Sequence, residues 1–377
     1  MSAKNIVYVS LIDTLSGGGG ERVCLDIARH LAVLGHSSVV VSLDGILRMA
    51  APKGVDYWGG DGDCFDVIGL FSLLESKYGK SFDFHFLFHL VGATNFYIDN
   101  KEAFHKKSAR CSIFFHGPMC EVFGVRTPFS TFRFKHYLEF WRIHKVVSKS
   151  RLRIKKLREA LAHGELYAVS RQILQECDSL GIAGVSLFRN GVDYREVQKS
   201  SIACCELLPR GKYIVHVARI SKEKRQDMLL QAYASSGAVL PLVIIGDGPS
   251  LPELKQLSEE LGITDRVLFK GFLQNPYPIL AGARFSIICS KFEGFCLSAL
   301  ESLTLGVPVL MTDRPYGIRS ELHNYPRELI SPDSVHGLAC KIGTLSDENL
   351  PCMRYELPFE AFDITREVCR FVDCSGI

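Results

Sequence analysis

Two cations, Arg219 and Lys224, lie five residues apart in one short stretch of the sequence. They follow an apolar run at 213–218 that predicts a strand, and open α/β domains bind ligands where strands end. Two positive charges on such a loop can clamp a diphosphate and neutralise a leaving group as its negative charge develops. The alternative is an ordinary charged surface loop, a role that Lys222 and Arg225 would also fit.

A second cluster, 293–301, begins and ends with a glutamate and enters a predicted helix. The Glu293 carboxylate lies in a loop and can accept hydrogen bonds from two vicinal sugar hydroxyls, whereas Glu301 could accept from both hydroxyls of a ribose. Gly294 permits a tight turn, and the first amides of the helix are free donors for hydroxyls or phosphate. The alternative makes Glu293 a helix-capping residue and Glu301 an exposed charge.

A glycine run near the start of the chain, 16–20, separates an apolar strand from a helical pattern. Glycines let the backbone approach a phosphate, whose charge a helix N-terminus favours. The spacing is not G-x-G-x-x-G because Arg22 occupies the last position, although Asp44 keeps a nicotinamide-binding alternative open; a flexible turn is the other alternative. His116 ends another strand before a Gly-Pro turn, which favours a functional role over a core one. No similar position singles out the other histidines.

Strand and helix patterns alternate along the whole chain. In the first half, strands are predicted at 6–9, 38–43, 84–91, 112–115 and 166–169, with a helix at 21–34. In the second half, strands are predicted at 213–218, 242–245, 267–269, 285–289 and 307–311, with helices at 226–235, 251–261 and 297–305. This alternation predicts an α/β protein with two Rossmann-like, doubly wound parallel-sheet domains. We place them at 1–195 and 205–355, with the connection within 198–210.

The composition, 47% hydrophobic and 23% charged, is typical of a soluble globular protein. The most apolar window, 82–91, is broken by Asp83, His85 and His89 and is too short to span a bilayer, and the start does not resemble a signal peptide; we therefore expect a cytoplasmic protein. Thirteen cysteines without a C-x-x-C pair predict reduced thiols, with Cys296 filling space. A net charge of +3 does not indicate nucleic-acid binding.

The basic residues concentrate at 142–158, which holds eight Lys and Arg and no acidic residue. Read as a helix, its apolar residues Ile143, Val147, Ile154 and Leu157 recur at three- and four-residue spacing. This pattern suits an interfacial helix that contacts anionic lipid, and equally a solvated helix packed on the core.

The glycine loop, the Arg219 and Lys224 loop, a turn at 246–249 and the E-x7-E element occur in this order. Together they resemble the retaining glycosyltransferases of the GT-B fold, the large family that includes bacterial polysaccharide and lipid glycosyltransferases. The resemblance extends over about 5–345 and is strongest over 213–322. It implies an acceptor-binding first domain and a nucleotide-sugar-binding second domain that face a cleft, with a C-terminal helix at 356–377 crossing back to the first domain.

The resemblance also implies roles for individual residues. Arg219 and Lys224 would bind the diphosphate, Glu293 the donor sugar and Glu301 the ribose, and His116 would lie beside the donor sugar. With these, the catalytic set is His116, Glu293, Arg219 and Lys224. The predicted substrate-binding residues are Gly18, Gly19, Gly271, Phe272, Gly294, Phe295, Cys296, Leu297 and Glu301.

Three positions depart from the family pattern. Ala218 replaces a frequent glycine before the arginine, Arg225 replaces one after the lysine, and Ser298 replaces a common proline. These changes affect backbone freedom rather than ligand groups. The stretch 312–319 resembles a variant seen in bacterial surface-polysaccharide enzymes.

The implied reaction transfers a hexosyl unit from a nucleoside diphosphate, with a weak preference for UDP, to a hydroxyl of a glycan or lipid-linked acceptor, and retains the anomeric configuration. No metal or other cofactor is expected, because the Asp-x-Asp element at 61–63 lies in a loop of the first domain. The protein would work in the cytoplasm, at the inner face of the membrane. Transfer to a soluble acceptor and a non-catalytic nucleotide-sugar binding protein remain as alternatives.

Overall fold

The structure is a computed structural model, in which the chain forms two compact units. Unit 1 comprises Met1–Arg189 with Glu367–Ile377, and unit 2 comprises Asn190–Arg366. The units divide before helix α7 (Tyr194–Ser200), because α7 packs on helices of unit 2. The sequence had ended the first domain at 195, within this helix. The structure describes residues 6–15, 18–59, 66–118, 154–155, 158–159, 161, 164–202, 213–314, 316–347, 355 and 357–374.

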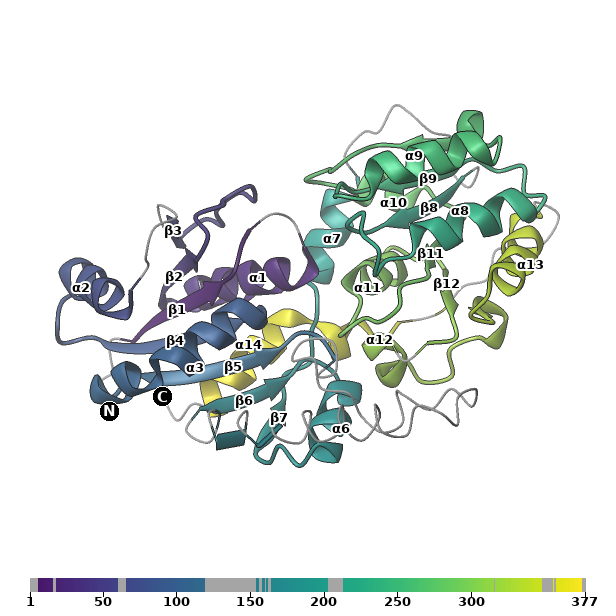
Figure 1. Ribbon diagram of the computed structural model, residues 1–377. Coiled ribbons are helices and arrows are strands. Elements are labelled where there is room, and N and C mark those ends of the chain that lie inside the picture. The colour runs from purple at the N-terminus through teal and green to yellow at the C-terminus, as the bar shows by residue number, and fades with distance from the viewer. Residues whose placement is uncertain are drawn as a thin grey trace, which may run out of the picture. The chain divides into compact units, whose positions relative to one another are not determined.

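Unit 1 is built on a parallel sheet in the order β3-β2-β1-β4-β5-β6-β7 (Figure 1). Its strands are β1 (Ile6–Ile12), β2 (Ser37–Ser42), β3 (Asp56–Gly59), β4 (Asp83–His89), β5 (Arg110–Phe115), β6 (Glu165–Ala168) and β7 (Val185–Leu187). The central strands β1 and β4 read as almost continuous apolar runs because helices bury both faces of a parallel sheet. The chain adds β2 and β3 on one side of β1, and β4 and the later strands on the other side. The position between β1 and β4 is therefore the topological switch point, where open sheets of this kind bind ligands.

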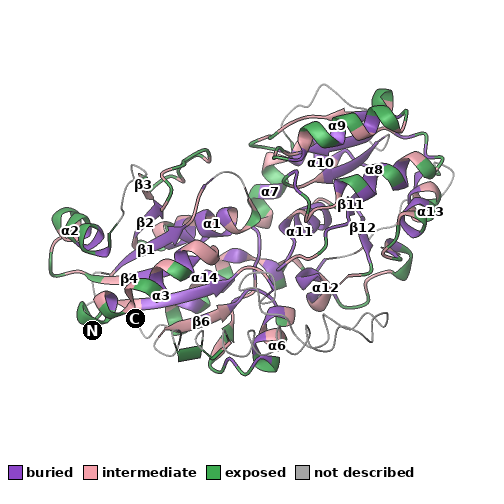
Figure 2. Ribbon diagram, in the orientation of Figure 1, coloured by how far each residue is buried: buried purple, intermediate pink, exposed green. Residues whose placement is uncertain are grey.

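The helices of unit 1 are amphipathic, and Figure 2 shows the buried strands between helices with exposed outer faces. They are α1 (Gly19–Val33), α2 (Val67–Tyr78), α3 (Leu90–Lys106), α6 (Arg171–Ser179) and the C-terminal α14 (Ile364–Cys374). The last part of α14 belongs to unit 1, and Phe371 packs there against Tyr8, His85 and Phe114. The C-terminal end of the chain thereby completes the core of the first unit.

Unit 2 repeats the same strand order, β10-β9-β8-β11-β12-β13, again all parallel. The strands are β8 (Ile214–Val217), β9 (Leu242–Ile245), β10 (Val267–Phe269), β11 (Phe285–Ile288), β12 (Val309–Thr312) and β13 (Ile330–Ser331). The helices are α7, α8 (Gln226–Ser235), α9 (Leu251–Glu260), α10 (Tyr277–Ala281), α11 (Leu297–Thr304), α12 (Gly317–Glu321) and α13 (Val335–Ser346), with 3-10 turns at Thr264–Arg266, Arg327–Leu329 and Phe359–Phe362. The switch point of this sheet lies between β8 and β11.

The predicted class, with two doubly wound parallel sheets, is confirmed, and every predicted strand overlaps an observed one. The predicted strand at 84–91 is too long, because α3 begins at Leu90 directly after β4. The predictions missed β3, β7 and β13, which are short outer strands. They also missed the helices α2, α3, α6, α7, α10, α12 and α13. Among the described helices, none combines the length and apolarity needed to span a bilayer.

Candidate functional site

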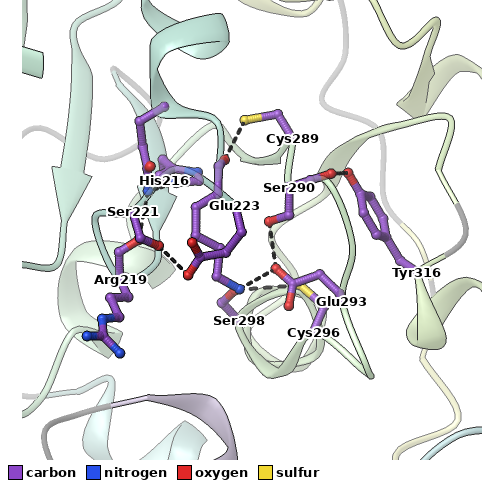
Figure 3. Close-up of polar contacts among 12 residues, drawn as sticks. His216, Arg219, Ser221, Glu223, Cys289, Ser290, Glu293, Cys296, Ser298 and Tyr316 are labelled. Atoms are coloured by element: carbon purple, nitrogen blue, oxygen red, sulfur yellow. Dashed lines mark hydrogen bonds and ion pairs between the residues drawn. The ribbon is translucent and has the colours of Figure 1, made fainter. Parts of the chain in front are cut away.

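The loop that follows β8 presents the two predicted phosphate cations differently. Arg219 is exposed, and Figure 3 shows its guanidinium directed away from the contacts around Glu293. Lys224 is only 22% exposed, and its ammonium forms an ion pair with Glu293 on the loop after β11 at 2.7 Å. The structure therefore brings Lys224 and Glu293 together at the switch point of unit 2, with Arg219 at the rim.

The ion pair fixes the charge state of Lys224. Burial lowers the pKa of a lysine, but the Glu293 carboxylate outweighs burial, and the pKa of Lys224 is raised. Ser290 also donates to the same carboxylate oxygen, Oε1, at 2.6 Å (Figure 3). Lys224 retains two further N–H donors, so the pair can contact a sugar and a phosphate without separating.

Backbone contacts join the loops after β8 and β11. Lys291 N–H donates to Glu223 O at 2.7 Å, and the Cys289 thiol donates to Lys224 O at 3.4 Å. On the other side, the buried Tyr316 hydroxyl donates to Ser290 O at 2.6 Å, as Figure 3 shows. Glu293 is thus placed by contacts from both neighbouring loops rather than by its own loop alone.

Two non-glycine residues beside this pair adopt left-handed backbone: Arg225 with φ +56° and Cys296 with φ +79°. Such conformations cost about 1–3 kcal/mol and gather at functional sites. Arg225 is stabilised there by Asp333, 2.5 Å away, which also pairs with Arg314 at 2.5 Å. The arginine that replaces a family glycine therefore ties the β8 loop to the loop after β13.

Glu301 is 4% exposed on α11, and Tyr277 donates to its Oε1 at 3.1 Å. The alternative of an exposed helix charge is therefore wrong. The capping alternative for Glu293 is also wrong, because Cys296 is the residue that precedes α11. Burial raises the pKa of the Cys296 thiol to about 12, so this sulfur remains protonated and fills space.

The other predicted donor contacts in unit 2 lie around the same sheet edge. Gly271, at φ +68°, follows β10 and accepts from Gly246 N–H at 2.8 Å, and the neighbouring Phe272 ring is 46% exposed. A Cβ on Gly246 would lie 1.9 Å from Ala218 O, so the turn requires glycine there. Gly294, Phe295 and Leu297 are buried in the turn that leads into α11.

In unit 1 the glycine loop leads into α1 and lies beside His116. Gly18 is the residue before the helix and donates its N–H to the Glu21 carboxylate, and Gly19 is exposed. At Gly20 a Cβ would lie 2.6 Å from Leu90 and 3.7 Å from His116, so the close approach requires glycine.

His116 is paired with a second histidine, His89, at 3.0 Å between Nε2 of His116 and Nδ1 of His89. Burial lowers the pKa of His116 to about 4 and that of His89 well below its usual value, so both rings are neutral near pH 7 and share one proton between these nitrogens. The next residue, Leu90, has φ +67°, and Asp13 accepts from the first amides of α3. The sequence analysis did not select His89 as a candidate residue. The structure places His89 at the end of β4, at the switch point of unit 1.

Sequence reasoning also missed Ser290, Tyr316 and Tyr277. Ser290 directly follows a predicted strand, a signal comparable to that of His116, whereas nothing in the sequence links Tyr277 to Glu301. The Asp-x-Asp element at 61–63 and most of 142–158 lie outside the described residues; within the latter, Arg158 donates to Leu180 O. In the part of the chain that the structure describes, no three His, Cys, Asp or Glu side chains converge as metal ligands would.

Comparison with known proteins agrees with this architecture. HepE from Anabaena, solved with UDP and glucose, aligns over 98% of this chain and 99% of its own, with a TM-score of 0.69 and 16% identity. The pneumococcal O-GlcNAc transferase GtfA, solved with UDP and GlcNAc, aligns over 99% and 98%, with a TM-score of 0.70 and 13% identity. The fold is therefore GT-B-like, as predicted.

Sequence relatives agree for the second half of the chain. Residues 206–356 match the family described as Glycosyl transferases group 1, so the predicted resemblance to GT-B glycosyltransferases is confirmed. An N-acetylgalactosaminyltransferase of Campylobacter jejuni, which acts on a diphospho-undecaprenol acceptor by name, is 35% identical over 34% of this chain and 35% of its own. The lipopolysaccharide 1,6-galactosyltransferase of Salmonella typhimurium is 27% identical over 47% and 49%. These matches span between a third and a half of the relatives' lengths.

Proposed function

We propose that this protein is a retaining glycosyltransferase that moves a hexosyl unit from a nucleoside diphosphate sugar to an acceptor hydroxyl. The observation that carries the proposal is the Lys224–Glu293 ion pair at the switch point of unit 2, with Arg219 exposed beside it. An ammonium and a guanidinium suit a diphosphate, and a carboxylate suits sugar hydroxyls. All three occur within two loops joined by backbone hydrogen bonds.

The donor would extend along this sheet edge. The diphosphate binds Arg219 and Lys224, with the first amides of α11 adding donors, and the sugar hydroxyls bind Glu293. The ribose binds near Glu301, and the base lies against Gly271 and the exposed Phe272 ring, whose face can stack on it.

In the proposed reaction the acceptor oxygen forms a bond to the anomeric carbon on the face from which the phosphate oxygen departs. The bond from the anomeric carbon to that phosphate oxygen breaks, and the departing phosphate accepts the acceptor's proton. Arg219 and Lys224 stabilise the charge that develops on the phosphate. Glu293, whose Oε1 accepts from Lys224 and Ser290, orients the sugar, and attack on the departing face requires no carboxylate nucleophile.

The donor and acceptor classes rest on the relatives. UDP accompanies both HepE and GtfA, which favours a uridine donor. The Campylobacter and Salmonella relatives act, by name, on a lipid diphosphate and on lipopolysaccharide, which favours a glycan or lipid-linked acceptor in bacterial surface-polysaccharide assembly. We propose action at the inner face of the cytoplasmic membrane, with 142–158 contacting anionic lipid, and independence of any metal.

The purified protein can be screened against a panel of UDP- and other nucleotide-sugars by thermal shift and by nucleotide release with and without acceptor. We expect one donor to stabilise the protein and to be hydrolysed slowly, unchanged by a chelator. Tight binding without release or transfer would instead identify a nucleotide-sugar binding protein, and full turnover on a soluble acceptor without membranes would favour the soluble-acceptor enzyme.

A further inference from the structure

His216 lies where the two strands at the switch point of unit 2 separate. β8 and β11 pair through Phe285 with Ile214 and Ser286 with Val215, and the backbone pairing then stops. The next residue of β8 is His216, which is fully buried, and its Nδ1 lies 2.8 Å from Ile287 O. The imidazole thus continues the contact between the strands where their backbones separate.

The other ring nitrogen of His216 extends these hydrogen-bond contacts towards the loop after β8, which carries Arg219. Nε2 of His216 lies 3.2 Å from Nε2 of Gln226, the first residue of α8. The same amide nitrogen donates to Arg219 O at 2.9 Å, and Gln226 is 1% exposed. Four elements are thereby connected: β11, β8, α8 and the loop that carries Arg219.

The two acceptors at the ends of this series of hydrogen bonds determine where each of its protons lies. Ile287 O and Arg219 O are carbonyl oxygens that can only accept. Nδ1 of His216 therefore carries a proton, and the amide nitrogen of Gln226, rather than its oxygen, faces Arg219. The second amide proton of Gln226 then points at Nε2 of His216, which must accept and carry no proton.

The backbone around Arg219 is held by hydrogen bonds on both sides, in addition to the one from Gln226. Ala218 N–H donates to Ile245 O at 3.1 Å, and Ile220 N–H donates to Asp247 O at 2.8 Å. Arg219 lies between these anchors, and its carbonyl is the group that Gln226 binds. Gln226 therefore adds a second anchor to the peptide between Arg219 and Ile220, on its carbonyl side, where Asp247 O already binds its N–H.

We propose that His216 and Gln226 are positioning residues for the donor diphosphate: the neutral imidazole orients the Gln226 amide, which fixes the backbone from which Arg219 reaches the phosphates. This inference rests on the proposed function, because it assigns Arg219 to the diphosphate. It adds two buried residues that touch no substrate. Figure 3 shows His216, which belongs to β8, with Arg219 on the loop that follows this strand and Glu293 on the loop after β11.

A charged His216 is incompatible with this arrangement, because an Nε2–H would face an N–H of Gln226. Burial lowers the pKa of His216 to about 4; its bond to Ile287 O raises the pKa, Lys224 on the β8 loop lowers it, and Glu293 on the β11 loop raises it. The neutral form therefore predominates near pH 7.

The first test is the protonation of His216 in the ligand-free protein, measured by imidazole nitrogen NMR shifts. The wild type is expected to show a proton on Nδ1 and none on Nε2 near pH 7. In Gln226→Glu, a carboxylate facing Nε2 should convert His216 to the doubly protonated form. A wild-type ring protonated on Nε2 would overturn the proposal whether or not the protein is a glycosyltransferase.

The second test is UDP affinity by calorimetry in Gln226→Met, which removes both amide donors and keeps the side-chain length. We expect the Kd for UDP to rise at least tenfold, while Gln231→Met, on the exposed face of the same helix, stays within twofold of the wild type. A folded Gln226→Met with wild-type UDP affinity would overturn the positioning role. Absence of UDP binding by the wild type would overturn the proposed function instead and leave the proton assignment to the first test.

Discussion

The two units share one strand order but place different chemistry at their switch points. In unit 1 the point between β1 and β4 is occupied by glycine backbone and two neutral histidines, His89 and His116. In unit 2 the point between β8 and β11 carries the ion pair of Lys224 with Glu293 and the exposed Arg219. The same topology therefore provides an edge with two cations in one unit and, in the other, an edge of neutral histidines where the Asp13 carboxylate already accepts from two backbone amides.

This difference indicates a division of labour. A charged edge suits the part of a donor whose charge changes during transfer, the diphosphate. An edge of neutral histidine nitrogens and close backbone suits hydroxyl groups, which need hydrogen bonds rather than a neighbouring cation. If the comparison is right, substitutions of the groups in unit 2 assigned to the diphosphate and ribose should affect nucleotide binding, and substitutions in unit 1 should affect transfer.

The largest effect is expected from removing a phosphate cation. Arg219→Ala and Lys224→Ala should each reduce kcat/KM at least a hundredfold, because one donor aimed at developing charge is worth about 2.7–4 kcal/mol. Lys222→Ala, an exposed lysine of the same loop, is the matched control and should retain activity. Steady-state kinetics checks this, and near-native turnover in either variant would contradict the assignment of that cation to the diphosphate.

The alanine variants of the two cations should differ in their free energy of unfolding. Lys224→Ala leaves the Glu293 carboxylate, only 13% exposed, without its cation, whereas Arg219→Ala removes an exposed side chain. Lys224→Ala should therefore unfold at lower denaturant concentration than Arg219→Ala.

A smaller effect is expected in unit 1. His116→Ala should reduce kcat about tenfold, as expected when one hydrogen bond to the substrate is lost. The Kd for UDP should not change, because the diphosphate groups belong to unit 2. A loss of UDP affinity in His116→Ala as large as its loss of kcat would contradict the proposed division of roles between the units.

How far the sequence could predict these sites depended on where their determinants lie. Glu293 and Lys224 belong to short patterns at strand ends, so local spacing was enough to select both, but their ion pair joins residues 69 positions apart and required the fold. His89 and His216 were missed because their roles come from strand order and from the separation of two strands, neither of which is a local pattern. The outer strand β13 was missed because two residues give no periodicity.

Acid should destabilise unit 1. Burial lowers the pKa of His85 to about 3, with Arg110 adding to the effect, and lowers that of His89 further below its usual range. Below about pH 6.5 the unfolded chain binds protons that the folded unit does not, so stability falls as pH falls, by at most about 1.4 kcal/mol per pH unit for each histidine.

The chain has two tryptophans, at 58 and 141, and both positions fall within the sequence range of unit 1, so tryptophan fluorescence during urea unfolding follows this unit. The unfolding free energy of unit 1 should decrease between pH 6.5 and pH 5, with a shallower slope in His85→Gln. An unchanged free energy over this range would contradict the neutral, buried state of these rings.

The smallest effect on catalysis is expected from the basic segment 142–158. Reversing Lys149, Arg153 and Lys156 to Glu should abolish co-sedimentation with anionic vesicles at low salt, because lipid docking depends on charge, while activity on a short soluble acceptor is unchanged. Reversing the exposed Lys53, Lys199 and Lys255 makes the same charge change and should retain binding. Binding that ignores salt and lipid charge would leave the segment as an ordinary surface helix.

The most direct test of the charged edge is calorimetry of UDP and of the UDP-sugar donor with two glutamate variants. Glu301→Gln should weaken both ligands, because both contain the ribose. Glu293→Gln should leave UDP affinity unchanged and weaken the sugar donor by about 1–3 kcal/mol, the value of its hydrogen bonds to the sugar. Equal weakening of both ligands by Glu293→Gln would contradict the assignment of Glu293 to the sugar end of the donor.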